Sequence, residues 1–411
     1  LDDDVIKEVV NLSKTMHSPV KRGTVIRPDP GEHALQTRCA PFWDPDAKVF
    51  KYWVGEYRES HDGVNWRKVA HAQNMEVAKC VFYDPTDPDS SRRYKAWQPD
   101  AFHVSGEGST WRQLEVKPIS AGDDYNFSVD LDNRLYIATV KHSATYGRSI
   151  WLSTSTDFEE WTEPEFIFEA DELDQELARQ RIGEWFEDST RPHPYINVPE
   201  HYGVDIYNMG AFRYEGLYIG LPSFFHHTGT VRPGWPGYAE MDLAPAAREY
   251  IAEYGDYSGF HHVQLACSRD LRNWHRLGNR QPFIDCSPIG AGSHDLSSVR
   301  PASNVLMRGD ELWFYYTGGK YYEIIRLGEA DCYAVCLAVL RRDGFVSLDA
   351  GEERGSVMTR ALKVPSGARC LCVNADLSNG ELRAVVLEGG GRPLGGFTDP
   401  QVVLVPGKTI E

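Results

Sequence analysis

The sequence lacks several features that would define a function at once. No stretch approaches the roughly 18 consecutive apolar residues that a membrane-spanning helix needs, and no C-x-x-C pair has zinc-binding spacing. P-loop, dinucleotide-binding and G-x-S-x-G motifs are also missing. Basic residues are in the minority, with 43 Lys and Arg against 60 Asp and Glu, which gives a net charge of −17. Such a surface repels nucleic-acid phosphates and anionic membranes, so we expect neither as a partner.

The eight cysteines do not suggest a disulfide framework. Cys370 and Cys372 lie on the same face of one predicted strand, a poor geometry for pairing with each other. Because the sequence starts at Leu1, removal of a secretion signal is an open alternative, and an extracytoplasmic location is favoured over the cytoplasm. Most of the cysteines lie in apolar segments where buried free thiols are usual, and the full set is Cys39, Cys80, Cys267, Cys286, Cys332, Cys336, Cys370 and Cys372.

A short repeat is present along the chain. In each copy a strand leads to Ser or a neighbour, then to an acid, often to Gly, and finally to Trp a few residues later. This pattern is typical of a hairpin in which the acid caps its own turn, Gly takes a positive φ and the aromatic ring packs under the turn. The copies are Ser60–Trp66, Ser105–Trp111, Ser155–Trp161, Ser268–Trp274 and a degenerate Arg342–Phe345.

A second predicted hairpin precedes each copy, so each unit holds about four strands, as a propeller blade does. We therefore predict an all-β protein, a five-bladed β-propeller over 1–350. Residues 351–411 are strand-like and either complete the last blade or form a small appended sheet. Two insertions, 169–199 with helical spacing and 228–259, are expected to wall the central funnel. The predicted blades are 32–72, 73–117, 118–168, 200–282 and 292–350.

The entrances of the innermost strands identify the candidate catalytic groups. Side chains at these positions share one cavity around the axis, and four blades place a carboxyl group there. A funnel lined by carboxylates suits glycosidic cleavage, in which one carboxylic acid protonates the leaving oxygen and another carboxylate activates water or attacks carbon. Crowded carboxylates raise one another's pKa and so supply a protonated acid. The alternative is that these acids cap loops or bind water. They are Glu76, Asp124 with its neighbour Asp123, Asp205, and Glu32, which lies just upstream of the blade-one position Gln36.

Other polar residues are candidates for substrate binding. Adjacent strand residues point to opposite faces, so at most one member of the pair His226-His227, and one of His261-His262, faces the pocket. We expect sugar-binding histidines rather than metal ligands. Lys141, like His142 and Arg148 beside it, suits an anionic group of a substrate, with surface salt bridges as the alternative. The predicted substrate-binding set is Glu76, His142, Arg148, Tyr207, His227, His262, Asp295 and Arg300, and no metal-ligand set is predicted.

Five stretches carry a family resemblance: Pro28–Glu32, Phe42–Pro45, Thr156–Trp161, Cys267–Trp274 and Arg342–Phe345. With them, residues from about 30 to 350 resemble the five-bladed propeller superfamily of glycoside hydrolase families 32, 43, 68, 117 and 130. The pattern is especially similar to family-32-like proteins of environmental bacteria. These motifs are mostly structural.

The resemblance implies three acids with different roles on different inner strands. By position, Glu32 corresponds to the base or nucleophile, Asp124 to the transition-state stabiliser or pKa modulator, and Asp205 to the general acid. The chain departs from the pattern in lacking the invertase-type Asn-Asp-Pro-Asn-Gly and Arg-Asp-Pro motifs, which puts fructan and arabinan specificity in doubt.

We therefore expect a glycoside hydrolase of a polysaccharide or its oligosaccharides, exo-acting because the insertions would close the funnel into a pocket. One alternative is a non-catalytic propeller that binds glycans or a protein. Another is a polysaccharide lyase with Tyr207 or a histidine as base beside a cation. No cofactor is expected to be required, and a structural Ca²⁺ ion in the central channel is compatible with the resemblance.

Overall fold

The computed structural model describes residues 3–32, 34–70, 80–98, 100–234, 244–321, 330–363, 373–377, 380–389 and 391–393. Within it, Met16–Phe345 form one compact unit, and Leu1–Thr15 with Val346–Glu411 form another. No helix in the described ranges has the length and apolar character needed to cross a membrane.

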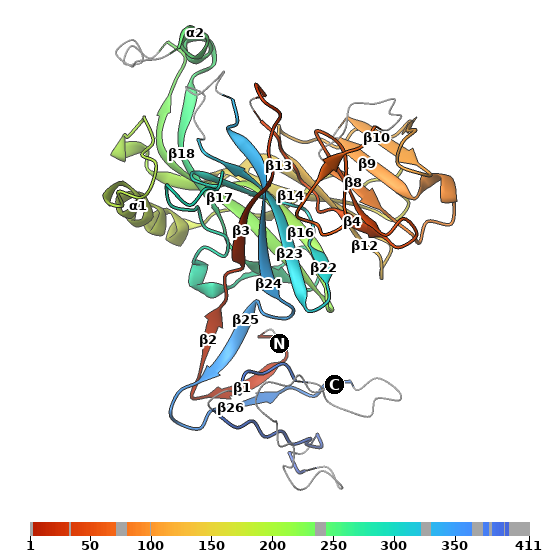
Figure 1. The fold of residues 1–411 in the computed structure, drawn as a ribbon. Helices are drawn as coiled ribbons and strands as arrows, with labels where there is room; N and C mark the ends of the chain where they lie inside the picture. Colours follow the sequence, from red (N-terminus) through yellow and green to blue (C-terminus); the bar gives the residue numbers. More distant parts are fainter. Residues whose placement is uncertain are drawn as a thin grey trace. The chain divides into compact units, whose positions relative to one another are not determined.

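Five antiparallel sheets of the larger unit are the blades of a propeller, which confirms the predicted all-β, five-bladed fold (Figure 1). Blade one contains β4 (Phe42–Asp44), β5 (Val49–Val54), β6 (Glu56–Ser60) and β7 (Arg67–Lys68). Blade two contains β8 (Cys80–Tyr83), β9 (Tyr94–Gln98), β10 (Ala101–Ser105) and β11 (Arg112–Leu114). Blade three contains β12 (Tyr125–Asp130), β13 (Leu135–Ala144), β14 (Gly147–Ser155) and β15 (Glu165–Phe168).

The last two blades are larger. Blade four contains β16 (Gly203–Tyr214), β17 (Leu217–Val231), β18 (Asp256–Val263), β19 (Ala266–Ser268) and β20 (Trp274–Arg276). Blade five contains β21 (Ser298–Pro301), β22 (Leu306–Arg308), β23 (Glu311–Gly319) and β24 (Tyr333–Arg341).

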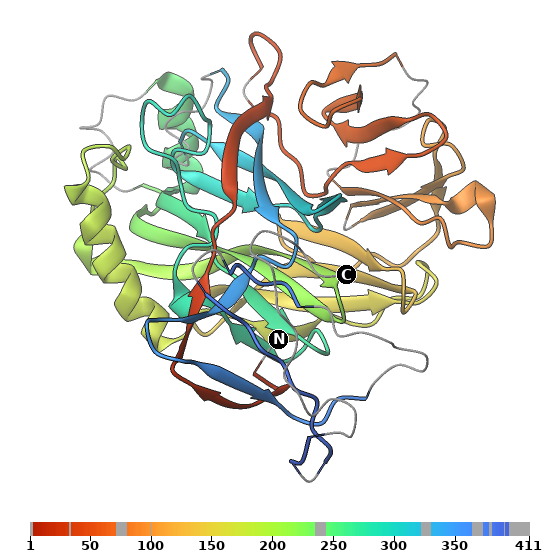
Figure 2. The ribbon, with the colours of Figure 1, turned by 60° about the horizontal axis from the view of Figure 1, so that its bottom comes forward.

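Blade five is closed by a strand from the start of the chain. Its fourth strand is β3 (Val20–Ile26), which pairs antiparallel with β24 rather than giving this place to the C-terminal segment. Figure 2 shows the two strands side by side. The pairing joins the two ends of the propeller chain, so the ring of blades is held shut by backbone hydrogen bonds.

The smaller unit contains two short antiparallel pairs. One joins β1 (Ile6–Val10) to β26 (Ser356–Thr359), and the other joins β2 (Leu12–Met16) to β25 (Val346–Ala350). The first fifteen residues, which the sequence analysis placed with the propeller, thus associate with the C-terminal segment.

The repeated turn has the predicted chemistry. In the first copy, Asp62 Oδ1 accepts hydrogen bonds from the backbone of Val64 and Asn65, and Gly63 has φ +76°. The indole of Trp66 donates to the Gly63 carbonyl oxygen, 3.1 Å away. Where the copy has no Gly, a bulkier residue takes the left-handed conformation, as the φ values of Phe158 (+70°) and Leu271 (+66°) show. The turn therefore depends on its capping acid more than on glycine.

The core lies between neighbouring blades. Ile137 and Leu152 of blade three, for example, pack in one cluster with Ile206 and Phe224 of blade four, and all four are buried. Other clusters bury apolar side chains in the same way between blades one and two, two and three, and one and five.

Both predicted insertions carry helices. The first holds α1 (Glu172–Glu187), which begins with a capping box formed by Asp171 and Asp174 and buries Ala178, Ile182 and Trp185. The second holds α2 (Pro245–Tyr254), between β17 and β18. Short 3₁₀ segments lie at Ser90–Arg92, Pro199–His201 and Gly278–Arg280.

Candidate active site

A network of buried polar groups joins four blades near the entrances of their inner strands. Asn126 of blade three donates to Ser303 Oγ at 3.1 Å and accepts from Asn208 of blade four at 2.9 Å. Ser303, which follows the inner strand of blade five, in turn donates to the Arg38 carbonyl oxygen of blade one. This network fixes the relative positions of the strands that present the candidate residues.

Asp124 is held by a bidentate ion pair. Arg38 Nε lies 2.8 Å from Asp124 Oδ1, and Arg38 Nη2 lies 2.6 Å from Oδ2. Both side chains are buried, with relative exposures of 1% and 4%. Burial alone would raise the pKa of Asp124, but Arg38 outweighs it and lowers this pKa to about 2. Asp124 is therefore an ionised carboxylate.

Asp205 lies at the entrance of blade four and is held from the neighbouring blade. Arg148 donates to Asp205 Oδ2 from its backbone amide at 3.2 Å and from Nη1 at 2.9 Å. His227 Nε2 lies 3.2 Å from the same oxygen. The other oxygen, Oδ1, is buried and makes no hydrogen bond to any residue in the described ranges. Burial raises the pKa of Asp205, but His227 and Arg148 together lower it overall. This direction is opposite to the one expected of a general acid.

A glycine allows this arrangement. Gly147, at the start of β14, has φ +104°, and a Cβ there would lie 2.9 Å from Asp205 Oδ2. The β13–β14 hairpin can therefore approach the carboxylate only because this position has no side chain.

Tyr207 points to the same face of β16 as Asp205 because side chains two residues apart in a strand share a face. The register with β17 shifts between Ile206 and Asn208, while Ile206 packs into the core on the opposite face. Lys141 Nζ lies 4.0 Å from the centre of the Tyr207 ring, and Arg300 Cζ lies 4.9 Å from it. Burial raises the pKa of the Tyr207 phenol, against the opposite effect of Arg300.

Two further cationic side chains, Lys141 and Arg300, connect the carboxylates to Tyr207. Lys141 is buried, and its ammonium lies 2.5 Å from Asp123 Oδ1. Burial lowers the pKa of Lys141 more than Asp124 and Asp123 raise it. Gln36 Oε1 accepts from Arg300 at 3.3 Å and from Arg38 at 3.5 Å. The site is thus one connected set of residues from blades one, three, four and five.

The histidine pairs divide between the two faces of the sheet. His227 reaches Asp205, and His261, rather than the predicted His262, packs on Tyr207 with ring centres 4.9 Å apart. His262 is 1% exposed and packs behind the sheet against His226. Strand alternation correctly predicted that only one histidine of each pair faces the pocket. The choice of His262 over His261 was wrong, because which of the two faces the pocket depends on the register of β18 with β17.

Several other predicted residues lie away from this set. Glu32 is exposed, and its carboxylate accepts from the backbone of Asp29 at 2.8 Å, which caps a local turn. His142 points to the other face of β13 from Lys141 and contacts the Ser120 carbonyl oxygen at 2.8 Å. Asp295 is fully buried and binds Lys21 of β3 at 2.6 Å. Glu76 lies outside the described residues.

The structure brings together six of the predicted residues, namely Asp124, Arg148, Asp205, Tyr207, His227 and Arg300. The sequence analysis did not name Arg38. The alternation of side chains along an extended segment could have identified Arg38, because it lies two residues after Gln36 and therefore on the same side of the chain.

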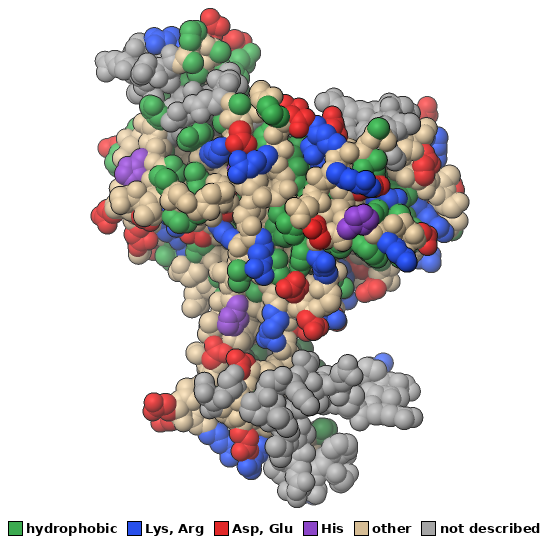
Figure 3. Space-filling model, viewed as in Figure 1, with side chains coloured by type: hydrophobic (Ala, Val, Ile, Leu, Met, Phe, Trp, Pro, Cys, Tyr) green, Lys and Arg blue, Asp and Glu red, His purple; other side chains and the backbone are tan. Residues whose placement is uncertain are grey.

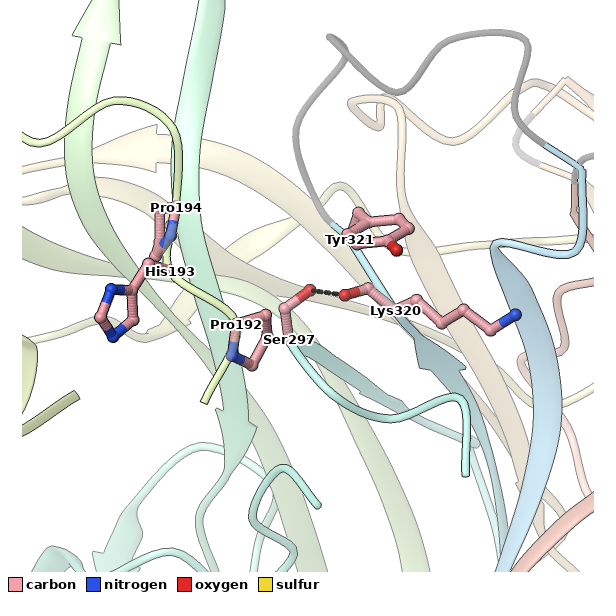
Figure 4. A pocket seen from close by; sticks show the side chains of 7 residues that line it. Pro192, His193, Pro194, Ser297, Lys320 and Tyr321 are labelled. Atoms are coloured by element: carbon pink, nitrogen blue, oxygen red, sulfur yellow. Dashed lines mark hydrogen bonds between the residues drawn. The ribbon is translucent and has the colours of Figure 1, made fainter. Parts of the chain in front are cut away.

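A pocket of about 210 Å³ lies between blades four and five (Figure 4). It is lined by Pro192, His193, Pro194, Gly259, Ser297, Lys320 and Tyr321. The two predicted insertions supply part of its wall, because 192–194 and Gly259 fall within them. On the face seen in Figure 3, basic, acidic and apolar side chains are intermixed.

The described residues contain no group of three or more His, Cys, Asp or Glu placed to hold a metal ion. A structural Ca²⁺ ion in the central channel stays a prediction. Cys39, Cys80, Cys286 and Cys336 are free and buried, as predicted for them, and Cys267 and Cys332 are also buried. Cys370 and Cys372 lie outside the described ranges.

In comparisons with known proteins, this chain is similar only to solved structures. No protein-family model matches the chain, and no curated protein matches it. A structure described as a glycoside hydrolase is 12% identical, with a TM-score of 0.44 over 80% of this chain and 94% of its own. A family 32 β-fructofuranosidase from Bombyx mori is 12% identical, with a TM-score of 0.41 over 80% of this chain and 65% of its own. An α-L-arabinofuranosidase from Fusarium graminearum is 11% identical, with a TM-score of 0.37 over 80% and 99%. The fold assignment therefore rests on the five sheets themselves.

Proposed function

We propose that this protein is a glycoside hydrolase whose reaction takes place at the Asp124–Asp205 site in the central funnel. The observation that carries the proposal is the state of Asp205. Asp205 is 4% exposed, one of its carboxylate oxygens is held by Arg148 and His227, and the other is buried without a hydrogen-bond partner among the residues that the structure describes. A buried polar atom without a partner is costly, so its presence at a strand entrance points to a ligand hydroxyl, a water or a reacting atom.

The charges assign roles different from those implied by the family resemblance. Asp205 is ionised, which suits a base that activates water or a nucleophile that attacks the anomeric carbon. Asp124 is also ionised and rigidly paired with Arg38, which suits stabilisation of the positive charge that develops on the sugar. Glu32 has no part in this proposal.

The proton for the leaving oxygen needs a separate source. His227 Nε2 lies 3.2 Å from Asp205 Oδ2, and an imidazole can carry a proton and donate it from a ring nitrogen. We assign the acid role to His227, with Tyr207 positioning the sugar. In this assignment the proton passes to the glycosidic oxygen as its bond to the anomeric carbon breaks, and water later restores it.

A lyase reaction fits the site less well. It would need Tyr207 as a phenolate or a neutral histidine as base. The pKa of Tyr207 is raised by burial, despite the nearby guanidinium of Arg300, so the phenol keeps its proton. The cations around Tyr207 therefore support binding of an oxygen-rich ligand more than proton abstraction by this residue.

The test is a screen of sugar release against a panel of plant, algal and microbial polysaccharides and their oligosaccharides. We expect reducing sugars to appear with at least one substrate, without an unsaturated product that absorbs in the ultraviolet. An unsaturated product would indicate the lyase. Binding to glycans with no product from any panel member would indicate the non-catalytic alternative.

A further inference from the structure

We propose that the pocket between blades four and five is a saccharide subsite that holds the sugar on the leaving-group side of the scissile bond. This inference rests on the proposed function, because it uses Asp205 as the reacting carboxylate. It assigns a binding role to the two insertions that interrupt the blade repeat.

The first step is the position of the pocket relative to the site. Gly259 on the pocket wall lies opposite His227 in the register of β17 with β18, and His227 bonds to Asp205. On the other wall, Ser297 lies three residues before Arg300, which packs on Tyr207. The pocket wall thus continues from the segments that carry His227 and Arg300, and we infer that one oligosaccharide chain can reach from the pocket to the reacting groups.

The second step is the chemistry of the lining. Pro192, Pro194 and Tyr321 supply ring surfaces, on which the C–H faces of a sugar can pack. Lys320 does not place its charge there, because its ammonium points away from the pocket (Figure 4) and binds Asp331 at 2.8 Å. The pocket therefore suits an uncharged, hydroxylated ligand rather than an anion.

The third step is the rigidity of the walls. Trp185 of α1 donates to the Pro192 carbonyl oxygen at 2.9 Å, and Ser297 Oγ donates to the Lys320 carbonyl oxygen at 3.0 Å. Gly259 cannot be replaced, since a Cβ there would lie 1.9 Å from the His226 carbonyl oxygen. A preformed wall loses little entropy on binding, which favours affinity.

The fourth step is size. The volume of about 210 Å³ is below the roughly 300–1,000 Å³ of pockets that hold drug-sized ligands. This space fits one sugar ring, so the subsite selects for at least one further sugar beyond the one that is cleaved.

The experiment compares two substrates of the sugar identified by the release screen: its trisaccharide and its glycosyl fluoride, which has no sugar on the leaving-group side. In Tyr321→Ala we expect KM for the trisaccharide to rise about tenfold, the loss of about one ring contact, while kcat/KM for the fluoride stays within about twofold. Tyr254→Ala, an exposed tyrosine on α2, is the matched control and should change neither. Ser297→Leu, which fills the pocket, should repeat the Tyr321→Ala result.

An equal effect on both substrates, or none on either, would overturn the subsite. If no glycoside is cleaved, the proposed function fails and the subsite is tested by binding alone. The wild-type protein and Tyr321→Ala are then applied to an array of immobilised oligosaccharides. Binding lost in Tyr321→Ala and kept in Tyr254→Ala would support a saccharide-binding site in this pocket without the leaving-group role, and absence of binding by the wild type would overturn both.

Discussion

Arg148 of blade three holds Asp205 of blade four through both its backbone amide and its guanidinium. The carboxylate at the centre of the proposed reaction is therefore positioned by a neighbouring sheet, and its geometry depends on how the two blades pack. The tight approach of Gly147 to Asp205 shows where this dependence is strongest.

Replacing Gly147 by Ala should show whether turnover depends on the position of the Asp205 carboxylate, apart from any loss of folding stability. The Cβ meets Asp205 Oδ2 at 2.9 Å, so the carboxylate must move, and a misplacement of about 1 Å can reduce turnover by ~100-fold. Gly216→Ala is the matched control, because Gly216 also has a positive φ, +88°, but nothing within 4 Å of its Cβ. Both variants should lose about 1–2 kcal/mol of stability in urea unfolding. Equal turnover in the two variants would show that Asp205 is not the sensitive group.

Arg38→Met should destabilise the propeller strongly. It leaves Asp124 as a buried charge without its main partner, which costs about 3–5 kcal/mol. The double variant Arg38→Met/Asp124→Leu removes both charges and should regain much of that loss. Urea unfolding of the wild type and the two variants measures this. A double variant less stable than Arg38→Met would contradict the account of the pair.

Stability should fall in acid as Asp124 takes up a proton. Its pKa is about 2 in the folded protein, below the ordinary value of about 3.9, so its contribution is present above about pH 4 and is lost as the pH falls towards 2. The unfolding midpoint of the wild type should therefore drop over this range. In Asp124→Asn the drop should be smaller. The same slope in both proteins would mean that the Arg38 pair does not persist in solution.

Lys21→Met should weaken the closure of blade five. Lys21 on β3 binds the buried carboxylate of Asp295, which also accepts from Tyr316 at 2.7 Å. Loss of a hydrogen bond to a buried charge costs about 1.5–3 kcal/mol. Lys117→Met, which removes an exposed ion pair with Glu163, should change the melting temperature little. If the two variants have the same melting temperature, the contact of Lys21 with Asp295 does not stabilise the closed ring of blades.

The five blades could be predicted because their signals are local. Each turn needs an acid that caps it and an aromatic ring within a few residues, and the structure shows this chemistry at Asp62 and Trp66. The closing strand β3 could not be predicted in the same way. Its partner β24 lies some three hundred residues away, and nothing in the sequence of β3 specifies that pairing.

The candidate site was predicted only in part, for similar reasons. The position of Asp124 and Asp205 at strand entrances follows from hairpin spacing. The partners that decide their charge, Arg38 and Arg148, come from other blades and depend on three-dimensional packing. Glu32 was misplaced because the inward-facing residues of blade one begin nearer to Gln36, while Glu32 caps a turn.

The most direct measurement of the central claim is the rate of sugar release by Asp205→Asn. The substrate is the one on which the wild type is most active, and Asp132→Asn, in an exposed hairpin turn, is the control. We predict that Asp205→Asn loses turnover by at least about a thousandfold, as expected when a reacting group is removed, while its circular dichroism matches the wild type. Full activity of a folded Asp205→Asn would contradict the account and remove this carboxylate from the reaction.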